Sequence, residues 1–397
     1  MHYETIAIHG GLSAESGHGA VTFPVYLTST FTQPSLGEFQ DYAYSRSANP
    51  TRIHAEKVAT QLEGARYGLA TASGMAADAL VFELLKAGDR VLLNDNVYGG
   101  TWRFASQLFE HRGLAFDVVR DFADYDFSKA PKDAAMVFLE TPSNPLLTVT
   151  DIADVARRAH EAGLLVVVDN TFMTSWLQKP LDLGADIVVY SATKYYGGHS
   201  DLLAGLVFTN NEEIYEKLKL FSDTLGGILS PAEAFLLVRG IKTLPLRMQR
   251  HQENAQRIAE FLHDHPGAGK VHYTGLPDDP GHVLQEKQAS GHGGVVSFEF
   301  NSDDYDLKTF VDNLNLFGFA VSLGGVESLI CQPATMTHES YPPKVQAAIG
   351  ITKNLLRISA GIENPEDLVS ELDRAFKASE RHPDAIQSDP AGGQSAV

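Results

Sequence analysis

A lysine lies just past the end of a buried apolar run near the middle of the chain. The run Ile187–Tyr190 is expected to be a strand, and it leads into "SATKYYGGHSD", residues 191–201, which contains Lys194. Ser191 and Thr193 place hydroxyl groups beside the lysine without adding charge. Most lysines in loops are solvated surface residues, but a partly desolvated lysine becomes a neutral amine that reacts with aldehydes. The stretch therefore predicts a reactive lysine.

Two further groups are expected at the same edge of the sheet as Lys194. Asp169 ends the preceding apolar strand, residues 164–169. The segment Ser73-Gly74-Met75 precedes a helical pattern, and the free N–H groups at a helix N-terminus bind anions. Ligands of open parallel sheets bind beyond the carboxyl ends of the strands, so we expect these groups to face one site.

This combination matches the requirements of pyridoxal phosphate (PLP). The cofactor needs a lysine for its aldehyde, a carboxylate facing its pyridine nitrogen and hydrogen-bond donors around its phosphate. The carboxylate keeps the ring nitrogen protonated, and the protonated ring is an electron sink that stabilises a carbanion. The histidines lack the spacing of metal ligands and no cysteine cluster exists, so we expect no metal, and His199 is interpreted as structural.

Strands and helices alternate over the part of the chain that carries these residues. Apolar runs predict strands at 90–95, 134–140, 164–169 and 185–190. Helices are predicted at 76–88, ending at Gly88, and at 151–163, stopped by Gly163. The second helix places four apolar side chains on one face, those of Ile152, Val155, Ala156 and Ala159. Apolar strands that alternate with helices indicate an α/β fold, with a mostly parallel sheet covered on both faces.

The chain is expected to comprise an arm, two domains and a tail. Residues 1–50 lack clean periodicity and are predicted to form an extended N-terminal arm. Residues 51–240 would form the large PLP-binding domain, and a long helical stretch around 231–265 would lead into a smaller α+β domain, 241–380. Residues 381–397 are expected to be disordered.

Composition excludes several classes of partner. The 397 residues include 31 Lys and Arg against 50 Asp and Glu, a net charge of −19 that is spread along the chain and argues against nucleic acid or anionic membranes. No apolar run approaches the roughly 18–20 residues that span a bilayer, and the N-terminus lacks the features of a signal peptide. The single cysteine, Cys331, is interpreted as buried and fits a reducing compartment. We therefore expect a cytoplasmic protein.

Several segments between residues 44 and 363 resemble one enzyme family. They are "YSRSANPTR", "ASGMAA", "NDNVYGGT", "ETPSNP", "VVDNTF", "SATKYYGGHSD", "RGIKTLPLRM", "VSLGGVESL" and "LLRISAGIE". By these segments the chain resembles the Cys/Met-metabolism family of PLP enzymes, which includes cystathionine γ-synthase, cystathionine β- and γ-lyases, methionine γ-lyase and the homoserine-ester sulfhydrylases. The resemblance implies an aspartate-aminotransferase-like fold, fold type I.

The resemblance also implies roles for the cofactor-binding residues. Lys194 would bind the cofactor's aldehyde and shuttle protons, Asp169 would pair with the pyridine nitrogen, and Tyr98 would stack on the ring and belong to the catalytic set. The phosphate would be held by Gly74, Met75, Ser191 and Thr193. Tyr44 and Arg46 would reach the phosphate of a neighbouring subunit, so the active site would be shared across a dimer within a homotetramer built as a dimer of dimers.

The same resemblance implies a substrate-binding set of Asn144, Ser322 and Arg357. The residues support the role of Arg357 independently, because it lies in the apolar strand 355–359 and a buried arginine needs an anion. The substrate's α-carboxylate would be that anion, held by the guanidinium as a fork.

The resemblance leaves the reaction open, and three positions bear on it. Methionine γ-lyases usually carry cysteine where this chain has Gly100, which weakens that assignment. Enteric and animal cystathionine γ-enzymes usually carry glutamate where this chain has Val321, which favours β-elimination. Trp102 and Trp176 are expected to pack, although Trp176 replaces a proline of many relatives, a change that would reshape the substrate mouth.

We therefore expect a PLP-dependent carbon–sulfur lyase of methionine and cysteine transsulfuration that acts on a small sulfur-containing amino acid and cleaves cystathionine by β-elimination, γ-elimination or both. The alternative is γ-replacement, as in cystathionine γ-synthase or an O-acylhomoserine sulfhydrylase. A protein of this fold without catalysis is disfavoured, since every expected cofactor residue is present.

Overall fold

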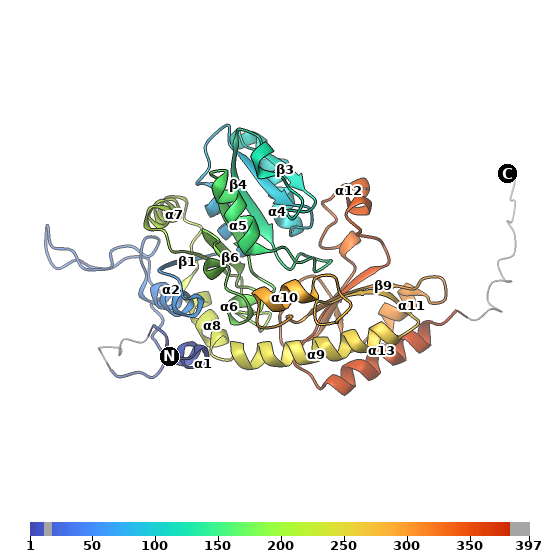
Figure 1. The fold of residues 1–397 in the computed structure, drawn as a ribbon. Coiled ribbons are helices and arrows are strands. Elements are labelled where there is room, and N and C mark those ends of the chain that lie inside the picture. The colour runs from blue at the N-terminus through green and yellow to red at the C-terminus, as the bar shows by residue number, and fades with distance from the viewer. Residues whose placement is uncertain (12–17, 382–397) are drawn as a thin grey trace, which may run out of the picture.

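The computed structural model describes residues 1–11 and 18–381, which form two sheets covered by helices (Figure 1). The larger sheet has seven strands in the order β1-β7-β6-β5-β4-β2-β3. Their bounds along the chain are β1 Tyr67–Thr71, β2 Arg90–Asn94, β3 Ala115–Val119, β4 Ala134–Glu140, β5 Leu165–Asp169, β6 Ile187–Ser191 and β7 Gly205–Thr209. Strands β3, β2, β4, β5 and β6 are parallel neighbours, which confirms the mostly parallel sheet.

Strand β7 departs from the parallel pattern. It runs antiparallel to both β6 and β1, with Ser191 opposite Gly205. A parallel return needs a crossover of a dozen or more residues, usually a helix. The connection from Ser191 to Gly205 instead forms the turn that carries Lys194. Strand β7 then pairs directly with β6, the strand before this turn.

Helices cover both faces of the larger sheet. They are α2 (Pro50–Glu63), α3 (Gly74–Phe82), α4 (Gly99–Leu108), α5 (Ile152–Glu161), α6 (Thr174–Leu177), α7 (Glu212–Leu225) and α8 (Pro231–Ile241), with 3₁₀ turns η1 (Glu110–Arg112), η2 (Phe127–Lys129) and η3 (Pro180–Leu183). Alternate strand residues point to opposite faces, so Val91 and Phe138 pack with α3, α4 and α7, whereas Leu92 and Val137 pack with α2 and α5. Burial on both faces explains why these strands are apolar throughout.

Two predicted helices end earlier than the sequence pattern indicated. The helix predicted to reach Gly88 ends at Phe82, because the N–H groups of Leu84 and Leu85 bond to carbonyls three residues back and tighten the chain into a turn. The stretch around 231–265 is two helices, α8 and α9 (Leu244–Asp264), rather than one. Pro245 in the first turn of α9 has no N–H to continue the helix from α8.

The smaller sheet has five strands in the order β10-β11-β12-β9-β8. Its strands are β8 (Ala268–His272), β9 (Val295–Phe300), β10 (Gly318–Phe319), β11 (Leu329–Cys331) and β12 (Leu355–Ser359). The remaining elements here are α9, α10 (His282–Gln288), α11 (Leu307–Asp312), the 3₁₀ turn η4 (Pro333–Thr335), α12 (Pro343–Ala348) and α13 (Pro365–Ser379). The long helices α9 and α13 pack along this sheet (Figure 1), and β12 at its centre carries Arg357.

The N-terminal region is only partly the extended arm that was predicted. Helix α1 (Tyr3–His9) is formed and packs by Tyr3 against Trp176, with ring centroids 5.2 Å apart. Residues 18–49 contain no helix and extend away from the two sheets (blue in Figure 1), with exposed apolar side chains such as Leu27 and Phe39. The predicted disordered tail, apart from Arg381, lies outside the described residues. No helix among the described residues is long and apolar enough to cross a membrane.

Candidate active site

A cavity of about 290 Å³ lies at the carboxyl ends of β4, β5 and β6, against the N-terminus of α3. Residues 321–323, Met336 and Thr337 close it from the side of the smaller sheet. Ten of the predicted site residues line this one cavity: Gly74, Met75, Tyr98, Asn144, Asp169, Ser191, Thr193, Lys194, Ser322 and Arg357. The strand-end rule explains the convergence, because parallel strands bring their carboxyl ends to the same edge.

The turn after β6 holds Lys194 inside the cavity. The Lys194 N–H bonds to the Ser191 carbonyl at 3.1 Å, and the Gly198 N–H bonds to the Lys194 carbonyl at 2.7 Å. The lysine Nζ donates to Ser322 Oγ at 2.9 Å. Burial and the nearby positive charge of Arg357 lower the pKa of Lys194 to about 8, against the opposing effect of Asp169. A substantial fraction of this amine is therefore neutral near physiological pH.

The carboxylate of Asp169 is oriented by the next turn of the chain. Its Oδ1 accepts the Thr171 N–H at 2.9 Å and the Thr171 Oγ1 hydroxyl at 2.6 Å. The same Thr171 Oγ1 accepts the Ser191 N–H at 2.8 Å, which ties the end of β5 to the end of β6. Burial raises the pKa of Asp169, opposed by these hydrogen bonds and by Lys194. A partly buried carboxylate with a raised pKa is suited to a cationic partner such as a protonated ring nitrogen.

The N-terminus of α3 meets the end of β6 closely enough to cradle an anion. Ser73 caps the helix, its Oγ accepting the Ala76 N–H at 3.1 Å. A Cβ on Gly74 would lie 2.7 Å from the Ser191 Cβ, so only glycine allows this approach. The N–H groups of Gly74 and Met75 lie in the first turn, where an α-helix leaves its amides without internal partners. The donor set fits a phosphate group.

Arg357 is a buried guanidinium without a carboxylate partner among the described ion pairs. Its side chain is 2% exposed; Nη1 donates to Asn144 Oδ1 and Nη2 to the Ser322 carbonyl, both at 2.8 Å. Its Nε has no partner among the described residues. Ser322 has a φ of 90°, a strained conformation for a residue other than glycine, and its bonds to Lys194 and Arg357 hold it there. The site is thus suited to an additional anion.

Tyr98 and three residues that the sequence reasoning missed complete the cavity. Tyr98 is 41% exposed and its N–H donates to Glu140 Oε2 at 2.7 Å. A Cβ on Gly100 would lie 2.4 Å from the Tyr98 ring, so the glycine allows the ring to lie there. Asp78, Arg103 and Glu140 also line the cavity without having been predicted as site residues. Glu140 pairs with Asp169 in the sheet register, so the strand-end rule could have found it, and Asp78 stands out as an acid within an apolar helix.

Tyr44 and Arg46 do not line the cavity of their own chain. The Arg46 guanidinium lies over the Tyr44 ring, 5.5 Å from its centroid, and donates to the Asp223 carbonyl. Tyr44 is 48% exposed. Both residues therefore remain available to a neighbouring molecule.

Other expectations had mixed outcomes. Trp176 packs against Tyr3, as predicted, and is not among the residues that line the cavity. Its effect on the substrate mouth stays a prediction. Trp102 packs as expected, stacked on Tyr341 at 4.3 Å, and Cys331 is buried. His199 Nδ1 lies 2.9 Å from the Gly197 carbonyl, within the turn that follows the lysine.

Comparisons with known proteins agree with the site. The family model described as Cys/Met metabolism PLP-dependent enzyme matches residues 4–377. The chain is 46% identical to cystathionine beta-lyase of Lactococcus lactis subsp. cremoris (94% of this chain, 98% of the relative) and 45% identical to cystathionine gamma-lyase of Bacillus subtilis (95% and 100%).

Solved structures agree equally well. Cystathionine gamma-lyase from Lactobacillus plantarum complexed with L-serine superposes with a TM-score of 0.92 at 43% identity, over 96% of this chain and 99% of that one. Cystathionine gamma synthase from Xanthomonas oryzae pv. oryzae in complex with cystathionine superposes with a TM-score of 0.91 at 41% identity, over 95% and 98%. With the family match and the cavity residues, these likenesses show that the chain belongs to the Cys/Met-metabolism family of PLP-dependent enzymes and has their fold type I architecture.

Proposed function

We propose that this enzyme is a carbon–sulfur lyase of transsulfuration that cleaves cystathionine by elimination. One observation carries the proposal: a lysine whose pKa is lowered to about 8, the Asp169 carboxylate and a buried arginine without an anionic partner among the described residues line one cavity. These groups suit an α-amino acid held at its carboxylate while a proton is taken from its Cα. The cystathionine lyases among the relatives support the substrate class.

The cofactor would be held by residues at the strand ends. The N–H groups of Gly74 and Met75 and the hydroxyls of Ser191 and Thr193 would hold the phosphate, Asp169 would hold the protonated ring nitrogen, and Tyr98 would cover the ring face. Bound PLP supplies the electron sink for negative charge on the substrate's Cα.

Lys194 would take the proton from Cα. The Ser322 hydroxyl accepts a hydrogen bond from its Nζ, which directs the amine toward the side of the cavity where Arg357 lies. Arg357 and Asn144 would hold the substrate's α-carboxylate and so fix Cα beside the lysine. Because the pKa of Lys194 is lowered to about 8, roughly half of the amine is neutral at pH 8 and able to act as a base.

The far end of the cavity would decide between β- and γ-elimination. Val321 lines the cavity and is 53% exposed. Its side chain is apolar, whereas a glutamate at this position would supply a carboxylate to hold the distal ammonium of cystathionine. Arg103, exposed at the rim, would meet the distal carboxylate. We propose relaxed specificity with measurable β-elimination. The alternative, γ-replacement on an acylated homoserine, is supported by the likeness to cystathionine gamma synthase.

Product analysis tests the proposal. The enzyme is supplied with cystathionine, and homocysteine, cysteine and 2-oxo acid are assayed separately. β-Elimination releases homocysteine and γ-elimination releases cysteine, each with a 2-oxo acid. Consumption of an acylated homoserine plus cysteine, with no cleavage of cystathionine, would instead establish the replacement reaction.

We also infer that the active site is completed by a second copy of the chain, within a homotetramer that works in the cytoplasm. The inference is supported by Tyr44 and Arg46, which lie outside their own cavity. Mixing Arg46→Ala chains with Lys194→Ala chains should restore activity, because some hybrid sites would carry neither defect. Verified mixed oligomers without activity would count against a shared site.

A further inference from the structure

Helix α3 carries an acid inside an otherwise apolar segment. Asp78 is 4% exposed, lies among buried residues such as Ala77 and Leu80, and lines the cavity. Its Oδ2 accepts a hydrogen bond from Thr101 Oγ1 at 2.8 Å. No lysine, arginine or histidine among the described ion pairs partners it. A buried acid with one neutral donor destabilises the fold when ionised, so its presence calls for a functional reason.

Helix α3 packs against β6, α4, β1, β7 and α7; the first two contribute groups that line the cavity, and the other three contribute apolar side chains. On the cavity side, the titratable or charged groups that line the cavity with it are Tyr98, Arg103, Glu140, Asp169, Lys194 and Arg357. On the other side, β1, β7 and α7 contribute apolar side chains to the shared core: Leu69, Val207, Ile214 and Leu218. The ionic environment of Asp78 is therefore that of the cavity.

Asp169 is the charge that acts on Asp78 most strongly. Burial and the charge of Asp169 together raise the pKa of Asp78 well above its usual range, and the Thr101 hydroxyl opposes them only in part. Asp78 and Asp169 line the same cavity, and two carboxyl groups placed close together do not both ionise readily without a cation between them, so the pair titrates as a unit. One cation that would fit is a protonated ring nitrogen at Asp169.

We propose that Asp78 is a positioning residue of the cofactor site: it shares one proton with Asp169 in the apoprotein and lets the bound ring nitrogen stay protonated to higher pH than Asp169 alone would. The inference deepens the proposed function and rests on the assignment of Asp169 to the ring nitrogen. On cofactor binding, the pair gives up its proton as an O–H bond breaks and an N–H bond forms on the ring. The net charge of the site does not change in this exchange.

Two measurements on Asp78→Asn test the proposal without relying on turnover. In the apoprotein, infrared pH-difference spectra of the wild type should show the carbonyl band of a protonated carboxyl group that Asp78→Asn lacks. The loaded enzymes are then compared by NMR, with PLP labelled with ¹⁵N at the ring nitrogen. In Asp78→Asn that nitrogen should lose its proton at a pH roughly one unit lower than in the wild type, a tenfold change in the protonation equilibrium. An unchanged ¹⁵N titration and an unchanged carboxyl band would overturn the proposal.

A second variant separates this role from a structural one. Thr101→Val is nearly isosteric and removes the only protein donor to Asp78 Oδ2 among the described hydrogen bonds. Without this donor the ionised form of Asp78 is less stable, so the carboxyl band of Thr101→Val should persist to higher pH than that of the wild type. In Asp78→Asn, by contrast, the band should be lost. A Thr101→Val band at the wild-type pH would count against the proposal, even if Asp78→Asn folded poorly.

Asp169→Asn distinguishes failure of the inference from failure of the proposed function. It should abolish ring-nitrogen protonation over the neutral range. If Asp169→Asn has no effect on the ¹⁵N shift, the assignment of Asp169 is wrong and the inference falls with it. If Asp169→Asn has this effect and Asp78→Asn has none, only the role of Asp78 is wrong.

Discussion

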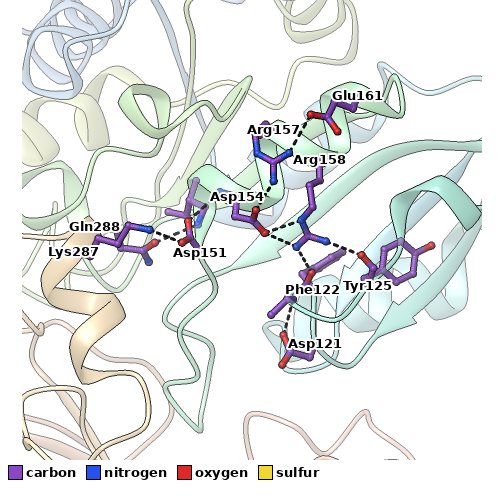
Figure 2. A network of polar contacts seen from close by, with 12 residues as sticks. Asp121, Phe122, Tyr125, Asp151, Asp154, Arg157, Arg158, Glu161, Lys287 and Gln288 are labelled. Carbon is purple, nitrogen blue, oxygen red and sulfur yellow. Dashed lines mark hydrogen bonds and ion pairs between the residues drawn. The ribbon is translucent and has the colours of Figure 1, made fainter.

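The cavity and the outer face of α5 use the same kinds of charged residue in opposite ways. In the cavity, burial is the largest cause that raises the pKa of each of three acids, Asp78, Glu140 and Asp169. On α5, Asp154 accepts hydrogen bonds from Arg157 at 2.8 Å and Arg158 at 2.7 Å (Figure 2). Burial is the largest single influence on Asp154 and raises its pKa, but the hydrogen bonds and charges of the two arginines together outweigh it and lower the pKa overall.

The α5 network attaches elements to one another. Asp151 caps the helix by accepting the Asp154 N–H at 3.0 Å and also accepts Lys287 Nζ from α10 at 2.8 Å. Gln288 of the same helix accepts the Ile152 N–H at 3.2 Å (Figure 2). Each charge here has a partner and access to water, so an ion pair of this network by itself contributes little to the stability of the fold.

The difference teaches what makes a charged group chemically useful in this molecule. Burial and the charge of Arg357 lower the pKa of Lys194 to about 8, whereas the Asp151 carboxylate raises the pKa of Lys287 above its usual value. Reactivity therefore follows from burial without full pairing, and attachment follows from pairing at the surface. The four predictions below test this contrast, from the largest expected effect to the smallest.

Replacing the cavity lysine should have the largest effect. Lys194→Ala should still bind PLP through its phosphate contacts but lose the absorbance of lysine-bound cofactor, and turnover of cystathionine should fall by about 10²–10⁴-fold or more, as expected for loss of a general base. The matched control is Lys287→Ala, which should keep wild-type turnover. Near wild-type turnover in Lys194→Ala would contradict the central assignment.

The pH dependence of cofactor uptake should report the neutral amine. Because the pKa of Lys194 is lowered to about 8, the fraction able to react with an aldehyde should rise as the pH rises through 8. Below that pH the rate of PLP uptake by the apoprotein should fall about tenfold per pH unit. Stopped-flow absorbance from pH 6 to 10 measures the midpoint, and a midpoint near the usual lysine value of about 10.4 would show that the cavity does not depress it.

Adding a charge to the cavity should redirect the reaction. Val321→Glu should move the products of cystathionine from homocysteine toward cysteine, because a carboxylate at this position would hold the distal ammonium with about 1.5–3 kcal/mol. That is about a tenfold to hundredfold change in the ratio. Val321→Gln, of similar size and no charge, separates charge from bulk. A wild type that releases only cysteine, or an unchanged ratio in Val321→Glu, would show that this position does not set the reaction.

The surface network should give the smallest effects, graded by burial. Arg158 also donates to the carbonyls of Phe122 at 2.6 Å and Tyr125 at 2.7 Å, so Arg158→Ala should lower the free energy of unfolding by about 1.5–3 kcal/mol. Arg157→Ala, the matched control on the same helix, should change it within error. The free energy of unfolding of both variants is measured by urea denaturation, and both variants should keep wild-type turnover.

The sign of a pH effect on this pair follows from Asp154. Its pKa is lower in the folded protein, so its pairing stabilises the fold above the unfolded pKa and is lost as the pH falls through the folded one. The cost of Arg158→Ala should therefore shrink in acid. If Arg157→Ala and Arg158→Ala lowered the free energy of unfolding equally, the proposed dependence of the stability effect on burial would be wrong.

The sequence by itself determined the sheet and the main chemistry of the site. Continuous apolar runs such as 164–169 and 185–190 predicted buried parallel strands, and β5 and β6 lie there. Since polar residues at strand ends must share one edge, Lys194 and Asp169 followed from local pattern alone. The segments that resemble the enzyme family added Asn144 and Arg357 to the predicted site, and the structure joins these two side chains by a hydrogen bond of 2.8 Å.

Only the tertiary structure decided which side chains enter the cavity from elsewhere and which turn away. From the sequence alone, Asp78 is one residue of a predicted helix and Arg103 is a surface residue. Both line the cavity because α3 and α4 pack against the strand ends. Trp176 follows the predicted motif "DNTF" yet packs on Tyr3, more than 170 residues earlier in the chain. Local pattern reports periodicity and propensity, whereas burial and pKa depend on neighbours distant in sequence, and those exist only once the two sheets are assembled.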